Sequence, residues 1–238
     1  AEKSAVDARA QLERMLDDAA RAASAVLPLA GQPCEDVVQT LRSQMAISPY
    51  SRSANLVADG LIYCTSLLGS YEESEDSASY AQGQLRLMAG NVVTPDRAVL
   101  VYRQAEAQHG VLIGIDGQHL INLLQINGQE VSLQIAVGRN WISADGHVAN
   151  APTRADSDYG IEVASSRYPF KVAAGYPPGV TLHYMQAHYQ PQWLLFLILG
   201  VLAGIGTYRL SLRASSPGTA LKRALEADEF IPYYQPVI

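Results

Sequence analysis

The chain has 238 residues, with 17 Lys and Arg against 23 Asp and Glu, and a formal net charge of −6. This acidic balance argues against nucleic-acid binding, which normally requires a basic face. About 190 residues precede an apolar stretch near the C-terminal end, which is enough for one sizeable domain or two small ones.

Two amphipathic helices are predicted at the start of the chain. Residues 3–27 carry apolar side chains at the helical period, and Pro28 and Gly31 close this helix. Its apolar face needs a partner, either a sheet of the same domain or the same helix of a second subunit. A second helix is predicted from Pro33-Cys34 to about Met45. The apolar positions of the two helices are Val6, Leu12, Met15, Leu16, Ala19, Ala23, Val26 and Leu27, then Val37, Val38, Leu41 and Met45.

Strands follow, interrupted by one short helix at Gln118–Leu124. Asn127-Gly128 and Asp145-Gly146 are hairpin signals, and the acidic stretch Tyr71–Ser79 is predicted to be a solvated loop. Helices followed by strands of this kind predict an α+β fold, with the N-terminal helices packed on an antiparallel sheet. The predicted strands are Leu61–Cys64, Ala98–Arg103, Gly110–Ile115, Val131–Val137, Trp141–Ser143, Gly160–Ser165 and Phe170–Gly175.

The stretch Trp193–Tyr208 carries no charged residue, and we interpret Pro191–Leu212 as a single transmembrane helix. The alternative is a buried core helix. A core helix of a soluble protein normally shows a polar stripe, and this stretch shows none. Within it, Gly200 and Gly204 form a G-x-x-x-G pair, which favours close approach of two helices and predicts a homodimer contact in the membrane.

Positive charge predicts the orientation of the span. No Lys or Arg lies between residues 172 and 208, whereas Arg209, Arg213, Lys222 and Arg223 follow closely. Because positive residues are retained in the cytoplasm, we expect residues 1–190 to lie outside, 191–212 to cross the membrane and 213–238 to lie inside. An outer domain must be exported, so we also expect a further segment upstream, such as a first transmembrane helix.

The two cysteines, Cys34 and Cys64, both fall in the outer part. An even pair in an oxidising compartment is most simply a disulfide, and two unpaired buried thiols are the alternative. A bond between them would close a loop of about 31 residues, worth roughly 3–4 kcal/mol of stability. Such a bond serves either as a structural staple or as a redox switch. No metal site is predicted, because His183 and His188 have the wrong spacing and no Cys or carboxylate nearby.

The tail Ala224–Ile238, ALEADEFIPYYQPVI, resembles the opening of an EAL domain, the bacterial phosphodiesterase domain that hydrolyses cyclic di-GMP. The resemblance rests on the Tyr-Tyr-Gln-Pro core and implies that Gln235 contacts the dinucleotide. It also implies that the Glu-Ala-Leu motif, and the carboxylates that bind two divalent metal ions (Mg or Mn), lie downstream. These 238 residues are therefore expected to contain no catalytic residue.

Cys64-Thr65-Ser66 resembles the Cys-Ser-Ser motif of CSS-type periplasmic sensor domains, which lie between two transmembrane helices ahead of EAL domains. Threonine replaces the middle serine but keeps the hydroxyl. The family's earlier cysteine, in a Gly-x-Pro-Cys context, is matched at residues 31–34. This resemblance favours the switch over the staple, with the oxidised form inactive and periplasmic thiol–disulfide oxidoreductases as partners.

These features together predict the redox-responsive sensor region of an inner-membrane phosphodiesterase that converts cyclic di-GMP to linear pGpG. The alternative function is a ligand-binding sensor module of a chemoreceptor or histidine kinase. About twenty residues between Arg209 and Phe230 leave too little room for the relay domain that such receptors usually carry, which favours the first function.

Overall fold

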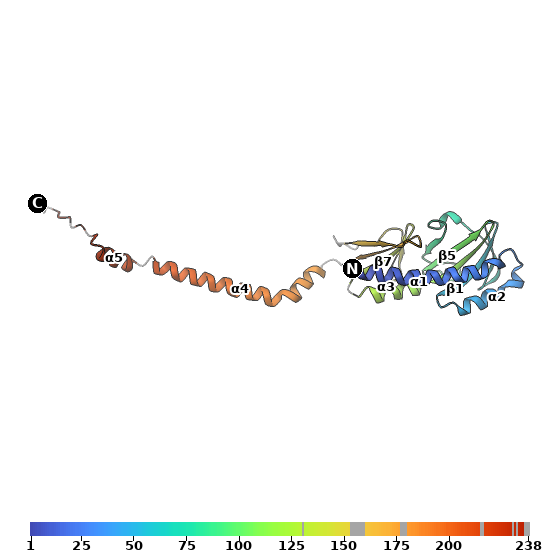
Figure 1. Cartoon of the computed structure of the whole chain (residues 1–238), viewed down its shortest axis with the longest axis horizontal. Coiled ribbons are helices and arrows are strands. Elements are labelled where there is room, and N and C mark those ends of the chain that lie inside the picture. The colour runs from blue at the N-terminus through green and yellow to red at the C-terminus, as the bar shows by residue number, and fades with distance from the viewer. Residues whose placement is uncertain are drawn as a thin grey trace. The chain divides into compact units, whose positions relative to one another are not determined.

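The computed structural model describes residues 1–129, 131–152, 160–176, 180–214, 217–229, 231 and 233–235. The chain divides into two compact units, Ala1–Pro178 and Gly179–Ile238 (Figure 1). The first unit contains helices and antiparallel strands, and the described residues of the second form two helices. The predicted α+β class is confirmed.

Three α-helices belong to the first unit: α1 (Glu2–Val26), α2 (Cys34–Ile47) and α3 (Gly117–Asn127). The two predicted N-terminal helices are confirmed as α1 and α2. A 3₁₀ turn, η1 (Leu27–Leu29), follows α1, and Pro28 occupies its first turn. Helix α3 begins after Asp116, whose carboxylate accepts a hydrogen bond from the backbone N–H of Gln118 and so caps the helix.

The larger sheet has six antiparallel strands in the order β3-β2-β1-β6-β5-β4. Helix α2 packs against the β1, β2 and β3 side of this sheet. The strands are β1 (Ser51–Ala58), β2 (Leu61–Thr65), β3 (Gly69–Ser74), β4 (Leu85–Met88), β5 (Val99–Glu106) and β6 (His109–Asp116), and a short 3₁₀ turn, η2 (Ser77–Ser79), lies between β3 and β4.

The smaller sheet has five strands in the order β10-β11-β7-β8-β9. Its strands are β7 (Ser132–Val137), β8 (Asn140–Ser143), β9 (Val148–Ala149), β10 (Ile161–Ala164) and β11 (Phe170–Gly175). Helix α3 connects β6 of the larger sheet to β7 of the smaller one and contacts both. The single sheet expected from the sequence is therefore divided into two.

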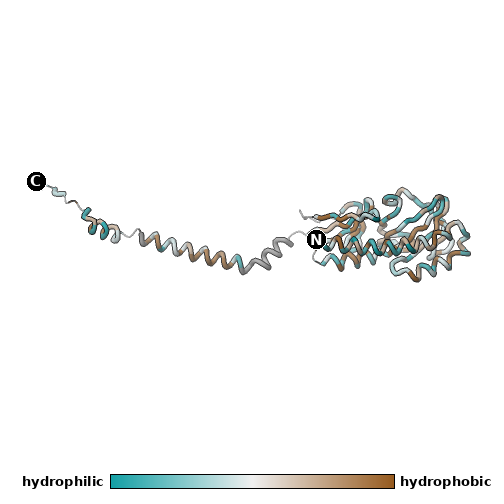
Figure 2. The backbone as a smooth tube through the Cα atoms, in the orientation of Figure 1, coloured by the Kyte–Doolittle hydropathy of each residue, from teal (hydrophilic) through white to brown (hydrophobic). Residues whose placement is uncertain are grey.

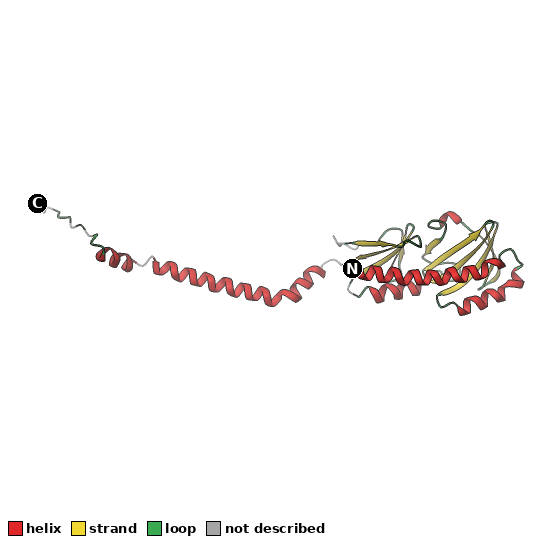
Figure 3. Ribbon diagram, in the orientation of Figure 1, coloured by secondary structure: helices red, strands yellow, loops and turns green. Residues whose placement is uncertain are grey.

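Helix α1 packs on both sheets, contacting β1, β5 and β6 of the larger and β10 and β11 of the smaller (Figure 3). Small side chains let the helix backbone come close to the strands: Ala5, Ala8, Ala19, Ala22 and Ala23 are all buried. Leucines between them, such as Leu12 and Leu16, fill the deeper positions. One continuous core results, with side chains from both sheets around α1.

Three local predictions were wrong. The predicted loop Tyr71–Ser79 overlaps β3, an edge strand whose charged, exposed side chains hide its strand character. Strand β1 was not predicted, because Ser51, Ser53 and Asn55 give it a polar face. Asn127-Gly128 does not form a hairpin, since Gly128 ends α3 instead.

The second unit contains α4 (Val180–Ala214) and α5 (Pro217–Glu226). Within α4, Gln192–Leu212 is long and apolar enough to cross a membrane, and none of it is buried inside the protein. This is the brown part of α4 in Figure 2. By length and composition it is a candidate membrane span, and the predicted span 191–212 falls within α4. The predicted cap Ser215-Ser216 lies outside the described residues.

Candidate functional site

A disulfide between Cys34 and Cys64 joins α2 to β2, with the two Cα atoms 5.3 Å apart. Cys34 is the first residue of α2, after the N-cap Pro33, and acidic Glu35 and Asp36 in the first turn favour a helix start here. Both cysteines are buried, with exposed fractions of 6% and 0%. The bond therefore lies under the start of a helix, inside the core.

A β-bulge in β2 directs two consecutive side chains toward the start of α2. The pairing of β2 with β3 shifts register between Ile62 and Cys64, and both Tyr63 and Cys64 pack on the helix side of the sheet. The Tyr63 hydroxyl accepts a hydrogen bond of 2.9 Å from the Gly31 N–H. Burial raises the pKa of Tyr63, so the phenol stays neutral. Gly31 has φ of +92°, a conformation that favours glycine.

Thr65 and Ser66, the other two residues of the motif, are buried and bond to backbone. The Ser66 hydroxyl accepts from the Ala54 N–H at 3.0 Å, and the Ser66 N–H donates to the Ala54 carbonyl at 2.8 Å. The Thr65 hydroxyl accepts from the Leu68 N–H at 2.8 Å. These bonds fasten the end of β2 to β1 and shape the turn that follows.

Helix α2 has a further contact with the same turn, because Arg42 Nε donates to the Ser66 carbonyl at 2.9 Å. Three connections therefore hold the α2 region to β2 and its turn: the disulfide, the Gly31–Tyr63 bond and the Arg42–Ser66 bond. Only the disulfide is covalent and can be removed by a reductant. We call these three connections the α2 joint.

The larger sheet covers a cavity of about 280 Å³ on its other face. Side chains alternate along a strand, so the residue after Cys64, Thr65, lines this cavity while Cys64 points into the core. Leu112 on β6 and Val99 and Val101 on β5 form part of the apolar floor. The disulfide and the cavity thus lie on opposite faces of one strand.

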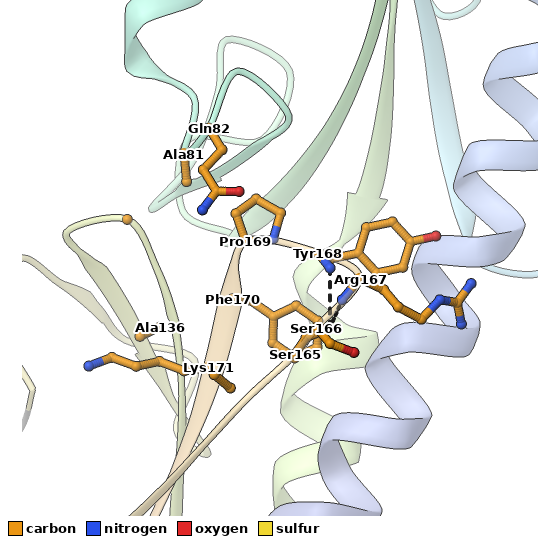
Figure 4. Close-up of a pocket in the computed structure, with 12 residues that line it drawn as sticks. Ala81, Gln82, Ala136, Ser165, Ser166, Arg167, Tyr168, Pro169, Phe170 and Lys171 are labelled. Carbon is orange, nitrogen blue, oxygen red and sulfur yellow. Dashed lines mark hydrogen bonds between the residues drawn. The ribbon is translucent and has the colours of Figure 1, made fainter.

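A wider hollow of about 600 Å³ lies beside the turn between β10 and β11, opposite Ala81 and Gln82 (Figure 4). The Ser165 hydroxyl accepts hydrogen bonds from the N–H groups of Arg167 and Tyr168 at 3.1 and 3.2 Å, drawn as dashed lines in Figure 4. The Ser165 hydroxyl also donates to Glu13 on α1 at 2.8 Å.

The charged side chains of this hollow are already paired. Arg167 forms an ion pair with Asp17 of α1, and Tyr168 donates to the same carboxylate at 2.7 Å. Lys171 pairs with Glu162 at 2.7 Å. The turn thereby fastens the smaller sheet to α1, so its polar groups have a structural role.

The remaining predicted site residues lie in the second unit. A Cβ added at Gly200 or Gly204 would meet nothing within 4 Å among the described residues, and the dimer contact stays a prediction. Gln235 is exposed, and its contact with a dinucleotide also stays a prediction. The side chains of His183 and His188 lie outside the described ones. No group of three or more His, Cys, Asp or Glu that could hold a metal is present among the described residues.

Sequence reasoning did not find the contacts of Gly31, Tyr63 and Arg42 in the α2 joint. Gly31 precedes Cys34 by three residues, and Tyr63 directly precedes Cys64. No sequence pattern indicates that Gly31 and Tyr63 contact each other. The bulge that turns Tyr63 toward the helix is set by strand register, which one sequence does not reveal.

Comparison with known proteins gives a consistent picture. The family described as "CSS motif domain associated with EAL" matches residues 1–189. Two similar proteins of Escherichia coli K12 are described as probable cyclic di-GMP phosphodiesterases: PdeG, 24% identical over 95% of this chain, and PdeD, 28% identical over 96%. The chain spans 45% and 44% of their lengths.

A solved structure has a similar fold over most of this chain. The extracellular ligand binding receptor from Desulfohalobium retbaense matches with a TM-score of 0.50 and 13% identity, covering 73% of this chain and 39% of the receptor. Since the family match extends over most of the chain and includes both cysteines of the α2 joint, this chain belongs to the family of CSS-motif domains associated with EAL.

Proposed function

We propose that this chain is the redox-responsive sensor region of a membrane-bound cyclic di-GMP phosphodiesterase. Residues 1–190 lie in the periplasm, residues 191–212 cross the inner membrane, and the tail with Gln235 begins an EAL domain that hydrolyses cyclic di-GMP to linear pGpG. Family membership and the names of the two relatives support the enzyme class. The family's association with EAL also favours this proposal over a chemoreceptor or histidine-kinase module.

The observation that carries the redox part is the composition of the α2 joint. Reduction removes its covalent connection and leaves two hydrogen bonds, each worth about 1 kcal/mol. The core under α2 stays packed through Val37, Leu41 and Met45. Reduction is therefore expected to loosen α2 locally without unfolding the domain.

A loosened α2 can influence the rest of the domain through α1. Helix α2 contacts α1, and α1 contacts both sheets. Two arrangements of α2 that differ by a few kcal/mol would be enough to change the population of an active state, because a switch needs only a small energy difference between its two forms.

The partners follow from this proposal. Periplasmic thiol–disulfide oxidoreductases set the state of Cys34 and Cys64, and a homodimer transmits the change through the span. Two divalent metal ions, Mg or Mn, are expected in the EAL domain, where they would activate water for attack on the phosphodiester.

The test measures phosphodiesterase activity of the full-length protein in membranes, before and after dithiothreitol. We expect reduction to raise the activity, and Cys34→Ser and Cys64→Ser to be active and insensitive to the reductant. Leu41→Ala is the matched control, because it weakens the packing of α2 but leaves the disulfide intact, and it should still respond. Activity that is unchanged by reduction, or cysteine variants that still respond, would refute the redox proposal.

A further inference from the structure

The cavity on the outer face of the larger sheet has the composition of a binding site. Its floor is apolar, with Val99, Val101 and Leu112 from β5 and β6. Neutral polar side chains, Asn55 of β1 and Thr65 of β2, lie beside this floor. A mostly apolar cavity with a few placed polar groups is typical of small-molecule sites.

One positive charge in the cavity has no counter-ion among the described residues. Arg86 of β4 lines the cavity, and among the described residues no carboxylate forms an ion pair with it. Its guanidinium lies 5.9 Å from the centre of the Tyr80 ring, a cation–π distance. By contrast, Arg103, which also lies over Tyr80, pairs with Glu75 at 2.5 Å, and Arg52 pairs with Asp116 at 3.4 Å.

Tyr80 lies next to this charge as a neutral hydrogen-bonding group. Burial, reinforced by the negative charge of Glu75, raises the pKa of Tyr80 to about 12, although Arg86 and Arg103 act in the opposite direction. The phenol therefore keeps its proton at physiological pH. Tyr80 and Arg86 together offer an O–H and a guanidinium, a combination that suits a carboxylate. Among the described residues, Glu73 is the only carboxylate that lines the cavity. It is on the exposed edge strand β3, and it accepts a hydrogen bond from Tyr71.

Apolar residues are exposed around the same cavity. Leu67 and Leu68, in the turn after β2, are 44% and 52% exposed. Val92 and Val93, in the loop after β4, are 75% and 41% exposed and also line the cavity. Two loops that present apolar side chains to solvent at one cavity indicate a surface that is covered when something binds.

We propose that this cavity binds a small organic carboxylate, with the carboxylate on Arg86 and Tyr80 and a short apolar chain over Val99, Val101 and Leu112. The volume of about 280 Å³ is at the lower end of ligand cavities and limits the size of the chain. A single cation suits a monoanion, whereas a phosphate dianion would need more donors. This inference goes beyond the redox proposal and does not depend on it.

The test is calorimetric titration of the whole chain in lipid nanodiscs. The probes are acetate, butyrate, isovalerate, 4-methylpentanoate and benzoate, each beside its uncharged amide. We expect at least one branched or aromatic carboxylate to bind with a micromolar Kd, and its amide to bind about tenfold or more weakly, because the amide loses the charge-assisted bonds.

Three variants localise the binding. Arg86→Gln should weaken it about tenfold or more, whereas Arg139→Gln, at an exposed arginine before β8 in the smaller sheet, should leave it unchanged. Val101→Phe keeps Arg86 but fills the floor, so it should also abolish binding even if Arg86→Gln proves unstable. The proposal is overturned if no carboxylate of the panel binds below millimolar Kd, if the amides bind equally well, or if folded Val101→Phe binds like the wild type.

Discussion

Cys34 and Cys64 differ in how closely each approaches the surface. Cys34 follows exposed Pro33 at the start of a helix, whereas Cys64 lies in β2 with no exposed surface. Thiol–disulfide exchange requires a thiolate to reach one of the two sulfurs. Opening the first turn of α2 would uncover Cys34 and leave Cys64 under the helix, so we expect a reductant to attack Cys34, with Cys64 as the leaving group.

Single-cysteine variants test this difference. We expect iodoacetamide to modify Cys34 in the Cys64→Ser variant about tenfold faster than Cys64 in the Cys34→Ser variant, because exchange at a buried thiol requires a larger opening. The rates are measured by mass spectrometry. In concentrated urea the two rates should become equal, which controls for intrinsic reactivity. Equal rates in the folded protein would contradict the assigned order of attack.

Asp17 stabilises the contact between α1 and the β10–β11 turn. Burial opposes its charge, but hydrogen bonds from Tyr168 and Arg167 and the charges of Arg167 and Arg21 outweigh this, so the pKa of Asp17 is lowered. A carboxyl group with a lowered folded pKa adds stability above its unfolded pKa of about 4. That stability is lost as the pH falls through the lower, folded pKa.

Asp17→Asn should therefore destabilise the protein by about 1–3 kcal/mol at neutral pH, the range for lost charge-assisted bonds. The difference from the wild type should begin to shrink below about pH 4, where the unfolded wild-type carboxyl takes up its proton, and should disappear below the lower, folded pKa. Urea unfolding at several pH values measures this difference in the free energy of unfolding. Asp7→Asn, at an exposed position of the same helix, should have little effect. A deficit that is constant with pH would show that charge is not the cause.

At the scale of elements, α2 is held by one covalent and two hydrogen-bonded connections. We expect reduction to speed amide hydrogen exchange in α2 while leaving most of β5 and β6 protected, because the three connections of the α2 joint end on β2 and the turn that follows it. Mass spectrometry of peptides from Cys34–Ile47 and from Val99–Asp116 measures both. Faster exchange in both peptides would mean that the disulfide stabilises the whole fold. Unchanged exchange in both would mean that it does not stabilise α2.

Helix α4 presents Gly200 and Gly204 one turn apart. In lipid, close backbone approach drives helix pairing, so Gly200→Leu and Gly204→Leu should lower self-association of the span in a membrane two-hybrid assay, by several fold. Gly206→Leu is the matched control, since residue 206 lies on another face of the helix. If all three variants associate equally, the pair makes no dimer contact.

The success of prediction varied with the kind of element. Helices α1 and α2 were predictable, because long periodic patterns and caps specify a helix locally. Strand β3 was not predictable, because an exposed edge strand has no apolar pattern. The hairpin predicted at Gly128 was wrong because glycine is common both in hairpin turns and at helix ends. Cys34 and Cys64 were found because they are the two cysteines of the sequence and lie in recognisable motifs, but Arg42 and Arg86 were not, since their contacts join elements that are far apart in the sequence.

At the scale of the whole molecule, the long helix α1 packs on both sheets. Its buried face runs from Ala5 to Val26, and the core around it includes Ile113 of the larger sheet and Val172 of the smaller. No local signal distinguishes one sheet from two, because strand partners are chosen by long-range packing. The division into two sheets on one helix therefore could not be predicted from the sequence.

The proposed orientation is tested with reporter fusions to the whole chain. A reporter that works only in the cytoplasm should be active after residue 238, and one that works only in the periplasm should be active when inserted near Gly146, in the turn before β9. The physical reason is the excess of Lys and Arg after the span. The opposite pattern of activities would reverse the assigned sides.

Cys64 and Thr65 lie on opposite faces of β2, so the redox proposal and the ligand proposal together would make the domain a detector of two coincident signals. Linkage is reciprocal: a molecule that binds the cavity tenfold more tightly in one redox state must shift the midpoint potential of the disulfide by about 30 mV. At the same periplasmic potential, the fraction of protein with a reduced disulfide would then differ between the presence and the absence of that molecule. One strand, through two adjacent residues, would combine a chemical and an electrochemical input into a single output.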